Sequence, residues 1–253
     1  MYARRDVVKS VGMLPLAVIL ADPVLARAAA STLEDVSLIL ENGDRVRASV
    51  AMPEVTPAPA VILIHEWWGL NDYIKSTAAE FAKAGYIAVA IDLYKGQVAS
   101  TPEEARAYMG AVEAPIAGET LARWIRWAGE HEKGTGRVGT VGWCFGGGWS
   151  LNASINSPVD ATVIYYGNVA KKAEALRAME GPVQGHFATE DKWINMEMVG
   201  GFVEEMKKAG QPDPEIYWYE ADHAFANPSG GRYDQADAQL AWSRTVAFLK
   251  AHL

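Results

Sequence analysis

Residues 139–148 read GTVGWCFGGG and contain Cys144, the single cysteine of the 253-residue chain. The residues before Cys144 form a short apolar run, which is typical of a buried strand, and the residues after it have helical character. Because there is no second cysteine, Cys144 cannot form an intramolecular disulfide. It is therefore either a small buried side chain or a nucleophile, and its surroundings must distinguish the two.

On both sides of this stretch, apolar runs alternate with segments of helical periodicity. We expect strands at residues 33–40, 45–52, 60–64, 86–91, 138–142, 161–165, 183–188 and 216–220. Helices are expected at 74–83, from 102, from 117, and at 147–156, 173–179, 196–209 and 236–253. Asn42-Gly43 between the first two strands is a strong hairpin signal. The alternation predicts an α/β fold with a doubly wound, mostly parallel sheet that begins with an antiparallel hairpin.

Ligands of such sheets bind beyond the carboxyl ends of the strands. The expected strand ends carry His65-Glu66-Trp67-Trp68-Gly69, Asp92-Leu93-Tyr94, Trp143-Cys144, Thr189-Glu190-Asp191 and Asp222-His223. A thiol, several carboxylates and an imidazole are therefore expected at one edge of the sheet.

The segment Gly142-Trp143-Cys144-Phe145-Gly146 matches the nucleophile-elbow pattern, in which the nucleophile lies on a sharp turn between a strand and a helix. Cysteine takes the place of the usual serine. The helix that begins after Cys144 directs backbone N–H groups toward the thiol, and its positive end stabilises a thiolate. The pattern favours a catalytic Cys144 over a buried apolar one.

A thiol nucleophile needs a base and a group that orients the base. Asp191 and His223 follow Cys144 in the chain order of such enzymes, with Glu190 as a competing candidate for the acid. We expect the backbone N–H groups of Trp67 and Phe145 to form the oxyanion hole.

These motifs resemble the dienelactone hydrolase family of α/β-hydrolases over residues 32–253. The resemblance implies an α/β-hydrolase fold and cleavage of a small-molecule lactone or carboxylic ester through a cysteine acyl-enzyme, with no cofactor and no metal. It also implies a catalytic role for Glu66, which lies beside the nucleophile in the family. Its negative charge disfavours the thiolate, so the hypothesis is that Glu66 keeps Cys144 protonated until substrate displaces it.

Two departures from the family bear on the substrate. Members that act on carboxylated dienelactones carry arginine two residues after Asp-Leu-Tyr and four residues after the histidine. This chain has Gly96 and Asn227 there, and the sequence leaves open whether Lys95, Lys192 or Arg232 replaces them. The residues expected to line the substrate pocket are Trp68, Tyr94, Trp143, Trp193 and Asn227. Their aromatic character favours an apolar or aromatic, uncharged substrate.

The first 28 residues resemble a twin-arginine export signal, which leaves residues 29–253 as a single hydrolase domain. Arg4-Arg5 precede an apolar stretch, and Ala26-Arg27-Ala28 matches a cleavage site. We expect cleavage after Ala28 and a periplasmic or secreted protein. The alternative is that the segment is an N-terminal helix of the domain.

The charge of the chain limits the classes of molecule that it is expected to bind. The net charge is −8 and the pI about 5.2, which disfavours nucleic acid and anionic membranes as partners. The sequence leaves the oligomeric state open, and a monomer is compatible with it. Two other functions are compatible with a lone thiol in this fold: a non-catalytic small-molecule binder with the hydrolase fold, and a thiol redox protein. The chain has no resolving cysteine for the second, and an intact Cys144, Asp191 and His223 set argues against the first.

Overall fold

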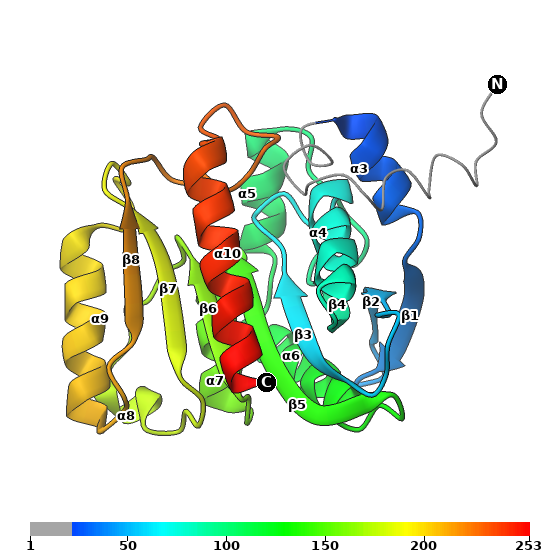
Figure 1. Cartoon of the computed structure of the whole chain (residues 1–253), viewed down its shortest axis with the longest axis horizontal. Helices are drawn as coiled ribbons and strands as arrows, with labels where there is room; N and C mark the ends of the chain where they lie inside the picture. The colour runs from blue at the N-terminus through cyan, green and yellow to red at the C-terminus, as the bar shows by residue number, and fades with distance from the viewer. Residues whose placement is uncertain (1–21) are drawn as a thin grey trace.

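The computed structural model describes residues 22–253 (Figure 1). These residues contain one eight-stranded sheet with the strand order β1-β2-β4-β3-β5-β6-β7-β8. The strands are β1 (Glu34–Ile39), β2 (Arg45–Ala51), β3 (Ala58–Ile64), β4 (Ile87–Asp92), β5 (Gly134–Trp143), β6 (Ala161–Tyr165), β7 (Val183–Ala188) and β8 (Glu215–Tyr219). β2 pairs antiparallel with both β1 and β4, and all later pairs are parallel. The mostly parallel sheet with an antiparallel start is therefore confirmed.

Helices cover both faces of this sheet. They are α3 (Pro23–Ala30), α4 (Asp72–Lys83), α5 (Pro102–Gly110), α6 (Ala114–Gly129), α7 (Phe145–Asn156), α8 (Ala173–Leu176), α9 (Met196–Ala209) and α10 (Gln235–His252). Alternation along β3 shows the two-sided burial. Val61 and Leu63 pack in a cluster with α4 and α10, whereas Ile62 and Ile64 pack in a cluster with α6.

The N-terminal part of the predicted signal, residues 1–21, lies outside the described residues. Residues 23–30 form α3, and the side chain of Asp22 caps it by accepting from the Val24 N–H at 2.8 Å. Ala29 packs against α4, and the Ser76 hydroxyl of α4 donates to the Ala26 carbonyl at 2.7 Å. The predicted cleavage site lies within this packed helix, and cleavage stays a prediction. Among residues 22–253, no helix has the length and apolar character of a membrane span.

Candidate active site

Cys144 lies on the turn between β5 and α7, as the elbow pattern predicts. Its backbone has φ 54° and ψ −114°, and residues other than glycine rarely adopt such a positive φ. Gly146 is required because a Cβ atom there would overlap the Ile64 carbonyl of β3. The helix starts at Phe145, two residues earlier than its glycine-rich sequence predicts, because the elbow sets the helix start. Cys144 is therefore held at the carboxyl edge of the sheet with a helix N-terminus directly behind it.

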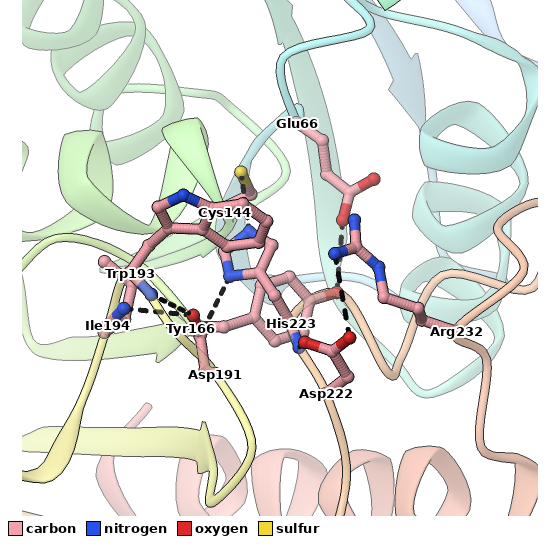
Figure 2. A network of polar contacts seen from close by, with 9 residues as sticks. All are labelled: Glu66, Cys144, Tyr166, Asp191, Trp193, Ile194, Asp222, His223 and Arg232. Carbon is pink, nitrogen blue, oxygen red and sulfur yellow. Dashed lines mark hydrogen bonds and ion pairs between the residues drawn. The ribbon is translucent and has the colours of Figure 1, made fainter.

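The structure brings Asp191 and His223 to this thiol (Figure 2). The His223 Nε2 atom lies 3.1 Å from the Cys144 sulfur, and His223 Nδ1 lies 2.6 Å from Asp191 Oδ2. The second oxygen of Asp191 accepts from the N–H groups of Trp193 at 2.8 Å and Ile194 at 3.0 Å. Asp191 is thus held by the chain after β7 and can fix the ring of His223. The competing candidate Glu190 is exposed and makes no side-chain hydrogen bond to another described residue.

These contacts determine the charge states of His223 and Asp191. Burial opposes the charge of His223, but hydrogen bonds with Asp191 and Cys144 raise its pKa to about 10. Burial also opposes the charge of Asp191, but hydrogen bonds from His223 and from the Ile194 and Trp193 amides hold its pKa below its usual value. The arrangement therefore favours an imidazolium beside a carboxylate, the charge state that follows transfer of the thiol proton.

The two residues whose backbone N–H groups are expected to form the oxyanion hole lie beside the thiol. Trp67 and Phe145 both line the cavity with Cys144. Neither N–H donates a hydrogen bond to any acceptor in residues 22–253. Below them, His65 Nδ1 lies 2.6 Å from the Glu66 carbonyl, and its Nε2 accepts from the Leu93 N–H at 3.2 Å. This buried histidine supports the loop and does not take part in the Cys144 contacts.

Glu66 is buried, but it faces partners other than the sulfur. One of its oxygens accepts from the Tyr166 hydroxyl at 3.2 Å, and the other accepts from the Asn227 side-chain amide. No hydrogen bond joins Glu66 to Cys144 in the described part of the chain. Burial raises the pKa of Glu66 to about 7, against the lowering effect of the Asn227 hydrogen bond. The hypothesis that Glu66 keeps the thiol protonated stays a prediction, and any such effect acts through charge and not through a hydrogen bond.

The cavity above Cys144 has a volume of about 860 Å³. Of the residues predicted to contact substrate, Trp68, Trp193 and Asn227 line it. Trp193 is 60% exposed and lies edge-on to His223, with 5.2 Å between ring centroids. Sequence reasoning missed several lining residues that come from α5, α7 and the chain after β6, and no motif marks them: Met109, Trp149, Asn152, Tyr166, Asn168 and Lys171.

Two predicted pocket residues, Trp143 and Tyr94, do not line the cavity. Trp143 is 2% exposed and packs on Tyr165, because it is the last residue of β5 and its side chain points into the core. Tyr94 is 4% exposed and packs on His65 and Phe145, so it supports the catalytic loop from behind.

The structure also shows which of the three candidate substrate-binding cations lies at the cavity. Lys95 and Lys192 do not line the cavity, whereas Arg232 does. Its guanidinium lies 5.5 Å from the Trp193 ring and 3.9 Å from Asp222. Arg232 is therefore the one of the three that can reach a bound substrate.

Comparison with known proteins agrees with this geometry. Residues 46–253 match the model of the dienelactone hydrolase family. The chain belongs to this family. Its relatives include a carboxymethylenebutenolidase of Cupriavidus pinatubonensis, 27% identical over 85% of this chain and 96% of the relative. Another is the carboxymethylenebutenolidase of Pseudomonas putida, 28% identical over 85% of this chain and 95% of the relative.

Solved structures show the same fold. A dienelactone hydrolase-like promiscuous phosphotriesterase from metagenomic libraries superimposes with a TM-score of 0.76 at 21% identity, over 87% of this chain and 98% of that one. The expected family and the α/β-hydrolase fold are confirmed. The chain is accordingly an enzyme, a hydrolase of lactones or carboxylic esters.

Proposed function

We propose that the chain hydrolyses its lactone or ester through a covalent Cys144 acyl-enzyme. His223 acts as general base and then as general acid, and Asp191 orients its ring. The observation that supports this most directly is the continuous line of contacts from Asp191 through His223 to the sulfur, at 2.6 Å and 3.1 Å. These distances lie in the range over which a base activates a nucleophile.

Each step can be assigned to an atom of the site. His223 Nε2 takes the proton from the thiol, and the sulfur attacks the carbonyl carbon of the substrate. The carbonyl oxygen becomes an oxyanion that accepts from the N–H groups of Trp67 and Phe145. As the intermediate collapses, the bond to the leaving oxygen breaks and His223 returns the proton to that oxygen. Water then attacks the thioester with His223 as base, which releases the carboxylic acid and restores the thiol.

We further propose that the substrate is uncharged and has an aromatic or apolar acyl group. Gly96 and Asn227 offer no cation where carboxylate-binding relatives are expected to carry arginine. The cavity presents Trp68, Trp149 and Trp193, and these rings favour apolar contact. Its volume is near the upper end of the usual range for small-molecule sites, roughly 300–1,000 Å³.

The N-terminal segment supports a proposal about location. Arg4-Arg5, the following apolar stretch and Ala26-Arg27-Ala28 match a twin-arginine export signal. We propose that the enzyme is exported and acts in the periplasm or outside the cell.

Turnover of p-nitrophenyl acetate by the wild-type chain and by Cys144→Ala tests the proposed chemistry. The wild-type chain should release p-nitrophenol in an enzyme-dependent reaction, and the variant should not.

A further inference from the structure

The edge of the sheet at the β1–β2 hairpin carries a polar face. On β2, Val46, Ala48 and Val50 pack toward the cluster that contains α6. Because side chains alternate along a strand, Arg45, Arg47 and Ser49 face the opposite side, toward α4. Figure 1 shows α4 beside this hairpin at one end of the sheet.

A groove of about 450 Å³ lies between this polar face and α4. Arg45 and Arg47 line it from the strand side, and Lys75 lines it from α4. Lys75 is half-buried, whereas the two arginines are exposed. None of the three cations forms an ion pair with an acidic side chain anywhere in residues 22–253. A groove lined by three cations without ion pairs in the described residues is unexpected on a chain whose net charge is −8.

Two carboxylates in the same groove already have partners. Asp92 accepts from the N–H groups of Tyr94, at 2.8 Å, and Gly96. Asp35 accepts from the Ser49 hydroxyl at 2.7 Å. Their hydrogen bonds hold them within the fold, so the groove keeps an excess of one positive charge, and its cationic donors have no acceptor among residues 22–253.

We propose that this groove is a second, non-catalytic site that binds a small oxyanion with more than one charged oxygen, a phosphate or a dicarboxylate. The guanidinium groups can each offer paired N–H donors to such an anion, and Lys75 supplies a point charge. The hydroxyl of Ser37, which also lines the groove, is a further donor.

The site is separate from the catalytic cavity, because the two share no lining residue. It nevertheless adjoins the catalytic loop. Gln97 and Val98 form one wall of the groove, and the next residue, Ala99, donates its N–H to the Trp68 carbonyl at 2.9 Å. Binding of an anion in the groove can be measured directly, without any assay of hydrolysis.

Isothermal titration calorimetry at low ionic strength and pH 7.5, with inorganic phosphate and separately with succinate, tests the proposal. We expect saturable binding of at least one probe with a stoichiometry of one. Tighter binding of phosphate assigns the site to phosphate compounds, and tighter binding of succinate assigns it to dicarboxylates. Arg47→Gln and Lys75→Gln should each weaken binding about tenfold or more, the effect expected when a charge-assisted hydrogen bond is removed.

Arg123→Gln is the matched control, because Arg123 is an exposed arginine of α6 on the other face of the sheet. It changes the net charge equally and should leave the affinity unchanged. Circular dichroism checks that each variant is folded. Absence of saturable binding for both probes would overturn the proposal, and so would an equal loss of affinity in Arg123→Gln, since either result removes the groove as the binding site.

Discussion

The Nε2 atom of His223 lies 3.1 Å from the sulfur of Cys144, although 79 positions separate the two residues in the sequence. His223 comes from the chain after β8, and Cys144 comes from the elbow after β5. Because four strands of the sheet, β5 to β8, run parallel, their carboxyl ends deliver both groups to one edge. The proposed chemistry depends on this contact, and the first two predictions test it.

Cys144→Ala should abolish hydrolysis of p-nitrophenyl acetate, because among residues 22–253 Cys144 is the only thiol or hydroxyl that hydrogen-bonds to the His223 ring. Cys144→Ser should retain little activity, since His223 must then deprotonate a far weaker acid. Initial rates measure both effects, and circular dichroism checks the fold. Near wild-type turnover by the alanine variant would exclude Cys144 as the nucleophile.

Asp191→Asn should lower kcat by about 10⁴-fold, the effect seen when the orienting carboxylate of a triad is replaced by an amide. The amide can still accept from the Trp193 and Ile194 N–H groups, so the loop should keep its conformation. The neighbouring variant Glu190→Gln is the control and should leave kcat within about twofold. If Glu190→Gln is the damaging change, Asp191 is not the acid.

The substrate preference follows from the absence of arginine at Gly96 and Asn227. We expect a higher kcat/KM for a neutral lactone or aryl ester than for a carboxylated dienelactone of similar size. Loss of a bidentate arginine contact costs roughly 2–5 kcal/mol, which is about 30-fold to several thousand-fold in specificity. A strong preference for the carboxylated compound would contradict the pocket assignment. Arg232→Gln would then show whether Arg232, the one of the three candidate cations that lines the cavity, has taken over the role.

Mass spectrometry of the protein isolated from its native host should show a chain that begins near Ala29. Cleavage there removes most of α3, including the Ala26 carbonyl that accepts from Ser76. The shortened chain should therefore remain active but unfold at a slightly lower temperature than the full-length one. A full-length chain recovered from the cytoplasm would support the alternative that residues 23–30 are a permanent helix of the domain.

The burial of His186 should make the free energy of unfolding depend on pH. Burial, with a smaller effect of the Arg244 charge, lowers its pKa from 6.5 to about 3. Between these values the unfolded chain binds a proton that the folded chain excludes, so the free energy of unfolding should fall as the pH drops below 6.5. The fall amounts to about 1–2 kcal/mol between pH 6.5 and 5 for one such group.

Urea unfolding at pH 6.5 and pH 5 measures this effect. His186→Gln should unfold with a smaller difference between the two pH values than the wild-type chain, because the titrating group is gone. His131→Gln, at a partly exposed histidine outside the core, is the control and should keep the wild-type difference. The carboxyl of Glu66 titrates in the same range, but it is present in all three chains and cancels from the comparison. Equal differences in all three proteins would contradict the assignment to His186.

The direction in which side chains point at the ends of strands could not be predicted from the sequence. The sequence predicts Trp143 in the pocket because it is an aromatic residue at a strand end, yet its side chain lies in the core. Tyr94 was expected there for a similar reason and instead supports the catalytic loop. A sequence identifies the end of a strand to within a residue or two, whereas a change of one residue reverses the face to which a side chain points.

The sequence by itself indicated the family, the alternation of strands and helices, the elbow around Cys144, and His223 with either Asp191 or Glu190 as the candidate partners of the thiol. These follow from local patterns, since hydrophobic periodicity and the glycine positions depend on near neighbours in the chain. Only the tertiary structure decided that Glu66 bonds Tyr166 and Asn227, that Arg232 reaches the cavity while Lys95 and Lys192 do not, and that Arg45, Arg47 and Lys75 share a groove. Those relationships join residues from distant segments, and packing of the whole sheet and its helices sets the distances between them.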